Sequence, residues 1–337
     1  MNRSSTIYLF VDRVNNKFPG FSKIIENIKK YIPNTNLIHE LDRIHPDEII
    51  LPMGIAGAWK LIKKKLPTRL AFIIDSPTLA MIGAIKFYFS QGEYLSRRVL
   101  IYALKYIKYS YLEFVVIRKY KYIIVVSEHD KNYLSRKYRS DKIRVISNGV
   151  DLPNNHFDKI VNFSNSIGVL SFWGAGGIDD IDWFVKSYLP KLRHDFPNLK
   201  FVTAGRGATN ETIRYFDKHN IVYLGELDDL GQFFNTIDIM ISTKRQECGI
   251  LNRILDAFAY QKIVLGYGSN LLAFSNLKNG YFAFSSYEDF RYHFEYIKSH
   301  KDEIALMTRN AYNYVKQNHS WRKNYEGLQQ LIKEAAN

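Results

Sequence analysis

The chain has 337 residues, an apolar content of 46% and a formal net charge of +14 at pH 7. This length exceeds one average domain and suits two domains of about 150 residues each. The single cysteine, Cys248, excludes an internal disulfide framework and fits a reducing compartment. Only a short apolar run precedes Asp12, and the chain lacks an uncharged apolar stretch of about 18 residues. We therefore expect neither a signal peptide nor a membrane span.

The positive charge is unevenly distributed. Residues 1–153 hold 26 Lys and Arg against 13 Asp and Glu, whereas residues 154–337 hold 21 against 20. A basic half beside a neutral half predicts that the first half meets a polyanion, either a nucleic acid or an anionic membrane surface. The alternative is a lysine-rich surface that is only solvated.

Apolar strand-like runs alternate with helical patterns along the whole chain. The expected strands are Thr6–Val11, Asn36–His39, Glu48–Leu51, Leu70–Ile74, Tyr122–Ser127, Lys142–Ile146, Ile167–Phe172, Lys200–Ala204, Val222–Leu224, Ile239–Ser242, Ile263–Gly266 and Tyr281–Phe284. The expected helices include Phe21–Ile32, Gly54–Leu66, Glu128–Tyr138, Asp180–Lys191, Glu211–His219, Leu230–Thr236, Ile250–Gln261 and Trp321–Ala335. Strands without alternation, separated by helices, predict parallel sheets covered on both faces. About twelve strands are too many for an eight-fold barrel, so we predict two doubly wound α/β domains.

The boundary between the two domains is expected near Asn148–Pro153, because Asn-Gly favours a turn and Pro153 ends regular pairing. The predicted scheme is a Rossmann-like domain over 1–150, a linker over 151–165 and a second Rossmann-like domain over 166–318. The terminal helix, 319–337, is expected to pack back on the first domain.

The stretch Tyr94–Tyr122 predicts a basic, tyrosine-rich amphipathic helix. At helical spacing Lys105 and Lys108 share one face, while Leu104 and Ile107 share another. Such a helix suits contact with a membrane interface. The alternative is a long helix that covers the sheet and leaves its lysines in water.

The sequence resembles the family 4 glycosyltransferases from Asn165 onward, and more weakly over its whole length. The segments that carry the resemblance are Val125–Leu134, Lys142–Asp151, Ile181–Leu192, Phe201–Gly207, Val222–Leu227, Gly249–Gly268 and His319–Tyr325. The resemblance implies a GT-B fold, in which two Rossmann-like domains face a cleft. It also implies a nucleotide sugar bound mainly by the second domain and retention of anomeric configuration.

The donor site is expected after the strand Ile239–Ser242, since ligands of doubly wound domains lie at the carboxyl ends of strands. Lys244 and Arg245 lie in that loop, and a helix is expected to begin after Gly249, where free N–H groups favour a diphosphate. Arg206 follows another strand within Gly205-Arg206-Gly207. The loop at 174–177, also rich in glycine, follows a third strand.

The resemblance adds three donor-binding candidates, Asn252, Arg253 and Asp256. The aspartate is expected to bind ribose hydroxyls from the helix face that it shares with Gly249. The family pattern has two glutamates seven residues apart. Here Cys248 occupies the first position and Glu247 lies one residue early, so either residue can stand at the donor sugar, and we assign Glu247 a catalytic role.

On the acceptor side the resemblance points to Gly20, in the loop before the first helix, and to Asp75 and Ser76 at a strand end. Asp75 can orient an acceptor hydroxyl or accept its proton. In a retaining mechanism the departing phosphate can itself be the base.

A metal site is not expected. Asp180-Ile181-Asp182 matches the Asp-x-Asp pattern of metal-dependent sugar transferases, but it opens a predicted helix, where aspartates cap the helix and favour its dipole. Neither glycine-rich loop matches the dinucleotide fingerprint. We therefore expect no cofactor, only a nucleotide sugar as substrate.

The resemblance, together with these residues, implies a metal-independent retaining hexosyltransferase that uses a UDP-sugar or GDP-sugar and a lipid-linked or polysaccharide acceptor. The resemblance places it in cell-surface glycan synthesis, including lipopolysaccharide, on the cytoplasmic face of the plasma membrane, and an anionic membrane surface is the expected partner. Two alternatives are a catalytically inactive GT-B scaffold and a basic nucleic-acid-binding protein. No recognised nucleic-acid module supports the latter, so nucleic acid is not an expected partner.

Overall fold

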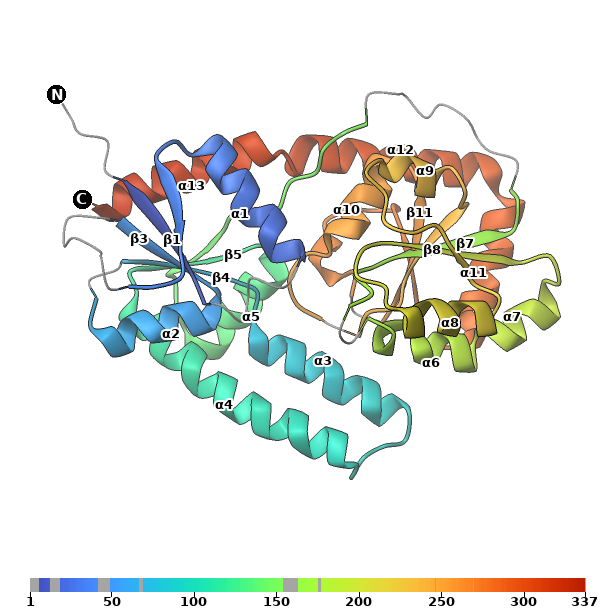
Figure 1. Cartoon of the computed structure of the whole chain (residues 1–337), viewed down its shortest axis with the longest axis horizontal. Coiled ribbons are helices and arrows are strands. Elements are labelled where there is room, and N and C mark those ends of the chain that lie inside the picture. Colours follow the sequence, from blue (N-terminus) through green and yellow to red (C-terminus); the bar gives the residue numbers. More distant parts are fainter. Residues whose placement is uncertain are drawn as a thin grey trace. The chain divides into compact units, whose positions relative to one another are not determined.

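A computed structural model describes residues 6–12, 19–41, 49–66, 69–153, 163–174, 177–245, 247–268 and 270–336. The chain divides into two compact units (Figure 1). Unit 1 comprises Met1–Gly149, Gln246–Leu251 and Ser320–Asn337, and unit 2 comprises Val150–Arg245 and Asn252–His319. The expected second domain, 166–318, thus differs from unit 2, because a short segment around Glu247 packs within unit 1.

Unit 1 contains a six-stranded parallel sheet in the order β2-β1-β3-β4-β5-β6. Its strands are β1 (Ile7–Val11), β2 (Thr35–Ile38), β3 (Ile49–Met53), β4 (Leu70–Ile74), β5 (Tyr122–Val125) and β6 (Ile143–Val145). Leu9, Leu51 and Phe72 are fully buried in this sheet. Continuous apolar strands are typical of parallel sheets that are covered on both faces.

The helices of unit 1 are α1 (Pro19–Tyr31), α2 (Gly54–Lys64), α3 (Pro77–Ser90), α4 (Arg97–Lys119), α5 (Glu128–Tyr138) and α13 (Trp321–Ala336). The last helix contributes Trp321, Tyr325 and Leu328 to the core on one side of the sheet. Figure 1 shows α3 and α4 as an antiparallel hairpin that extends beyond the sheet of this unit. Among the described residues, no helix is long and apolar enough to cross a bilayer.

Unit 2 contains a second six-stranded parallel sheet, in the order β12-β11-β10-β7-β8-β9. Its strands are β7 (Ser166–Leu170), β8 (Lys200–Ala204), β9 (Val222–Tyr223), β10 (Ile239–Ser242), β11 (Ile263–Tyr267) and β12 (Phe282–Phe284). Its core is strongly aromatic, with Trp173, Phe184 and Phe201 buried together. Two parallel sheets confirm the predicted doubly wound α/β class and exclude the single barrel.

The helices of unit 2 are α6 (Asp179–Ser187), α7 (Leu189–Asp195), α8 (Asn210–Lys218), α9 (Leu230–Phe234), α10 (Asn252–Ala259), α11 (Tyr287–Ser299) and α12 (Lys301–Asn318), with a short 3₁₀ turn at Leu272–Phe274. The prediction of one helix over Asp180–Lys191 is wrong. Pro190 lies in the first turn of α7, where its missing N–H is tolerated, and the helix divides just before it.

Candidate functional site

The carboxyl end of β4 presents Asp75 through a strained turn. The register of β4 against β5 shifts between Phe72 and Ile74, and Ile74 has a φ of 72°. The Asp75 N–H donates to the Ile73 carbonyl at 2.9 Å, which closes a three-residue turn around Ile74. A β-branched residue at positive φ costs about 1–3 kcal/mol, and such strain gathers at functional sites. The turn therefore supports a functional role for Asp75.

Gly249 lies against Asp75 within unit 1. A Cβ added to Gly249 would come 3.2 Å from Asp75 Oδ2, and the φ of Gly249 is 70°. Both the left-handed backbone and the close carboxylate favour glycine at this position. The structure thus brings together two residues that the sequence analysis assigned separately to the acceptor and to the donor.

Asp130, a residue that sequence reasoning missed, holds this arrangement. Its Oδ1 accepts the Ser76 N–H at 2.8 Å, and its Oδ2 accepts the Gly249 N–H at 2.8 Å and the Ser127 hydroxyl. Burial raises the pKa of Asp130, and the hydrogen bonds from Ser127, Ser76 and Gly249 act in the opposite direction. Ser127 also caps α5 by accepting the Asp130 N–H at 3.0 Å. The S-x-x-D pattern directly after a strand was therefore the available sequence signal.

Ser76 does not line an acceptor pocket as expected, because it is fully buried. It is the N-cap of α3, where its hydroxyl accepts the Leu79 N–H at 3.2 Å. The same hydroxyl donates to Glu113 Oε1 at 2.7 Å. Both functions of the hydroxyl are occupied inside unit 1, so Ser76 positions Asp75 through the backbone.

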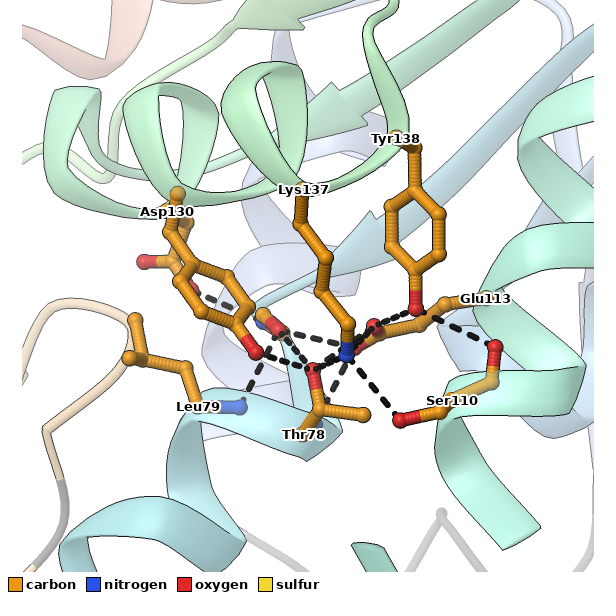
Figure 2. A network of polar contacts seen from close by, with 9 residues as sticks. Thr78, Leu79, Ser110, Glu113, Asp130, Lys137 and Tyr138 are labelled. Atoms are coloured by element: carbon orange, nitrogen blue, oxygen red, sulfur yellow. Dashed lines mark hydrogen bonds and ion pairs between the residues drawn. The ribbon is translucent and has the colours of Figure 1, made fainter. Parts of the chain in front are cut away.

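Glu113 is the centre of a buried polar network that joins α3, α4 and α5 (Figure 2). Its carboxylate accepts the Thr78 N–H at 3.0 Å, the Thr78 hydroxyl at 2.7 Å and the Tyr138 hydroxyl at 2.8 Å. The Lys137 ammonium lies 3.5 Å from the same carboxylate and donates to Thr78 Oγ1 and Ser110 Oγ at 3.0 Å each. Burial, with the charge of Glu113, raises the pKa of Tyr138. The network fixes the α3–α4 hairpin next to the turn that presents Asp75.

Glu247, the second catalytic candidate, is buried in unit 1 and paired with Lys86. The Lys86 ammonium donates to both carboxylate oxygens, at 3.1 and 3.0 Å. The Glu247 side chain is 7% exposed, whereas that of Lys86 is 64% exposed. Lys86 was not singled out from the sequence, because its partner lies 161 residues further along the chain.

Gly20 lies in the first turn of α1 rather than in a loop before the helix. The preceding Phe18 of the expected loop lies outside the described residues, and so does part of the glycine-rich loop at 174–177. Pro19 supplies the helix start, since proline is well tolerated at the first helical positions.

The cationic loop of Lys244 and Arg245 lies in unit 2 at the carboxyl end of β10. The Trp183 indole N–H donates to the Thr243 carbonyl at 3.2 Å, and the Asn270 amide donates to the Lys244 carbonyl at 2.8 Å. Arg245 donates to the Asp179 carbonyl at 2.7 Å. The backbone of this loop is therefore held from two sides.

Asn252 and Arg253 form the start of α10, so the helix expected over Ile250–Gln261 is present and begins two residues later than expected. Arg253 Nη1 donates to the Leu170 carbonyl at 2.9 Å and to Ser171 Oγ at 3.1 Å, at the carboxyl end of β7. Burial lowers the pKa of Arg253, and the charge of Asp180 opposes this effect. Arg253 thus connects α10 to the central strand of the unit 2 sheet.

Asp256 does not share a helix face with Gly249, because the left-handed Gly249 precedes the start of α10. The aspartate lies one turn into α10 and is 8% exposed. The pKa of Tyr260, one turn further on, is raised by burial first, then by Asp229 and by Asp256. The expected role of Asp256 in binding ribose hydroxyls stays a prediction.

Arg206 follows β8, where its guanidinium pairs with Glu226 at 2.7 Å. Both side chains are more than half exposed. The adjacent Gly205 has a φ of 135°, and a Cβ there would lie 1.8 Å from the Ser171 carbonyl oxygen. This glycine is therefore required by backbone packing between β7 and β8.

Asp180 and Asp182 lie in the first turn of α6, as predicted. Asp182 pairs with Lys186 at 2.8 Å and accepts the Tyr215 hydroxyl at 3.0 Å. No group of three or more metal-ligating side chains occurs within the described ranges. The aspartates favour the helix dipole from this position.

Two family descriptions match the chain. Residues 14–153 match "Glycosyltransferase Family 4", and residues 167–283 match "Glycosyl transferases group 1". No curated protein sequence matches significantly.

Among similar solved structures, TarM has a TM-score of 0.61 and 14% identity over 85% of this chain. The chain spans 55% of the length of TarM, and a TarM variant from S. aureus has been solved with UDP, fondaparinux and α-GlcNAc-glycerol. Sucrose-phosphate synthase from Thermosynechococcus elongatus has a TM-score of 0.68 and 11% identity, with 98% of each chain covered. WaaG, a glycosyltransferase involved in lipopolysaccharide biosynthesis, has a TM-score of 0.63 and 12% identity, with 97% of this chain and 99% of WaaG covered. At these identities the likeness shows the fold, and the two family matches together show that the chain belongs to the family 4, group 1 glycosyltransferases of GT-B fold.

Proposed function

We propose that the chain is a retaining, metal-independent hexosyltransferase that moves a sugar from a UDP-sugar or GDP-sugar to a lipid-linked glycan. In this proposal it works at the inner face of the plasma membrane in cell-surface glycan synthesis, as a lipopolysaccharide or polysaccharide transferase. The observation that carries the proposal is the strained Ile74 turn, which presents Asp75 against the left-handed Gly249. The role of WaaG in lipopolysaccharide biosynthesis and the UDP complex of the TarM variant support the class of acceptor and donor.

The nucleotide part of the donor is assigned to unit 2. Transfer releases a nucleoside diphosphate, and cations placed where its charge develops lower the barrier. Lys244 and Arg245 lie in a loop held by Trp183 and Asn270, and Arg253 stands at the helix start that follows. These cations can act in place of a metal ion.

The acceptor is assigned to unit 1. Asp75 is suited to orient an acceptor hydroxyl, and the departing phosphate accepts the proton of that hydroxyl. Glu247 is assigned to the donor sugar, and its buried carboxylate lies 3.0 Å from the Lys86 ammonium. The same ion pair favours a second candidate, an inactive scaffold, because it leaves Glu247 bound to a lysine rather than to a substrate.

Turnover of a panel of UDP-sugars and GDP-sugars, with lipid-linked glycan acceptors, tests the proposal. We expect release of UDP or GDP in excess EDTA, with the anomeric configuration retained in the product. Loss of turnover in EDTA that manganese restores would overturn metal independence, and an inverted product would overturn retention. Tight nucleotide binding without any turnover would establish the inactive scaffold instead.

A matched pair of arginine variants tests the donor site. Loss of an arginine–phosphate contact weakens binding by roughly 1.5–3 kcal/mol, so Arg245→Ala should raise the UDP or GDP dissociation constant about tenfold or more. Arg214→Ala, on the exposed side of α8, should leave it unchanged. Equal constants for both variants in titration calorimetry would contradict the assignment.

A further inference from the structure

A row of large apolar side chains lies in solvent along α4. Its members follow one another at intervals of four and three residues: Leu100, Leu104, Ile107, Tyr111 and Phe114. Such spacing places all of them within roughly 80° of arc on one helix face, over a length of about 21 Å. Leu104 is 60% exposed and Ile107 is 65% exposed, while Leu95 at the tip of the hairpin is fully exposed. Contiguous apolar surface of this kind marks an interaction site.

Leu100, Leu104 and Ile107 lie on the side of α4 that faces away from α3, whereas the Tyr111 ring lies 5.8 Å from the Trp59 ring of α2 and the Phe114 ring lies 6.5 Å from the Tyr138 ring of α5. The opposite side of α4 packs on α3, where the rings of Tyr88 and Tyr102 stack at 5.8 Å. Near its carboxyl end α4 buries Glu113, Val116 and Ile117. The Glu113 network therefore fixes the rotation of α4 about its axis, and the row faces outward as a consequence.

Positive charge accompanies the row. Residues 94–122 contain seven Lys and Arg, whereas their single acidic residue, Glu113, is buried in the network. Lys105 and Lys108 are exposed, Lys108 at about 40° and Lys105 at about 100° of arc from the edge of the row, and Arg118 lies over the Phe114 ring at 4.6 Å. Long basic side chains beside an apolar helix face suit the boundary between acyl chains and anionic headgroups. A nucleic acid would use the charges but not the leucine and isoleucine side chains, so the combination favours a lipid surface.

We propose that the α3–α4 hairpin is a membrane-docking element, in which α4 lies in the plane of an anionic bilayer surface. Leu100, Leu104 and Ile107 enter the acyl boundary, and the flanking basic residues contact lipid phosphates. This inference deepens the proposed function, because it names the surface of the chain that contacts the membrane. It rests on the proposed function only in assuming that the acceptor is lipid-linked. Docking itself needs neither nucleotide nor sugar.

Co-sedimentation of the full chain with vesicles tests the docking. We expect binding to phosphatidylcholine vesicles that contain phosphatidylglycerol, little binding to phosphatidylcholine alone, and release as salt is raised. The double variant Leu104→Asp with Ile107→Asp should lower the partition coefficient about tenfold or more. Leu306→Asp, at a leucine that is 57% exposed on α12 in unit 2, is the matched control and should change nothing.

Charge-reversal variants separate the electrostatic contribution to vesicle binding from the apolar contribution. Lys105→Glu with Lys108→Glu should abolish the preference for anionic vesicles, whereas Lys298→Glu with Lys301→Glu, two exposed lysines of unit 2, should preserve it. A tryptophan placed by Ile107→Trp should shift its emission to the blue on anionic vesicles. An unshifted emission maximum would overturn insertion.

Several results would overturn the proposal. Equal binding to neutral and anionic vesicles, or to neither at low salt, would do so. A stable dimer that Leu104→Asp dissociates, without any vesicle binding, would identify the row as a contact between two copies of the chain. Vesicle binding by a chain that releases no nucleotide from any sugar donor would leave the docking intact and overturn only the proposed function.

Discussion

The buried pair of Glu113 and Lys137 allows a quantitative test of how strongly the Glu113 network holds the α3–α4 hairpin next to the Asp75 turn. Three variants are needed: Glu113→Gln, Lys137→Met and the double variant. Glu113 is fully buried, and Lys137 is 19% exposed and 3.5 Å from its carboxylate. Removal of one partner of a buried pair costs about 3–5 kcal/mol, because the other charge stays buried without compensation.

The two single variants should differ. Without Lys137 the Glu113 carboxylate still accepts hydrogen bonds from Ser76, Thr78 and Tyr138, so we expect a loss of about 3 kcal/mol. In Glu113→Gln the Lys137 ammonium still donates to Thr78 and Ser110 and is partly exposed to solvent. We therefore expect the free energy of unfolding to fall by about 2 kcal/mol. The double variant removes both charges and should lose less than the sum, with a coupling of about 1–2 kcal/mol.

Native-state hydrogen exchange with mass spectrometry is the suitable assay, since a chain of two units need not unfold in one step. Peptides from α3, α4 and α5 should report the loss, while peptides from α8 in unit 2 serve as an internal control. Lys142→Met, at a lysine that donates to the backbone carbonyls of Arg118 and Tyr120, is a control variant. Losses below about 1 kcal/mol in both single variants, or additive losses, would refute the reasoning.

Two further predictions concern the Asp75 turn and unit 2. Gly249→Ala forces an alanine into a left-handed backbone at about 1–2 kcal/mol and places its Cβ 3.2 Å from Asp75 Oδ2, so sugar transfer should fall in an initial-rate assay. Gly225→Ala, with a φ of 83° and open space around its Cβ, controls for backbone strain alone, and equal activity of both variants would contradict the role of the contact. Burial lowers the pKa of His293 below its ordinary 6.5, so on acidification the unfolded state takes up its proton before the folded state does. The melting temperature of unit 2 should therefore fall as pH drops below 7. His293→Phe should make this fall with pH less steep, and an equally steep fall in the variant would disprove the role of His293.

The sequence by itself determined the strands and the fold class. Every expected strand is present, and β4, β8 and β10 have the expected bounds, because long apolar runs in parallel sheets are bounded by helices and turns that leave a clear local pattern. The cationic loop after β10 and the aspartates at the start of α6 were also predictable, since strand ends and helix starts are local features. The break at Pro190 was equally visible in the sequence but was overlooked.

Only the tertiary structure decided which side chains meet. Asp130 bonds to Ser76 and Gly249 at separations of 54 and 119 residues, and Lys86 meets Glu247 across 161. Such pairings depend on how the strands order themselves in the sheet, and no local period records that order. The orientation of α4 is the same kind of result: its sequence shows an apolar face, and only the buried Glu113 network determines that this face points to solvent.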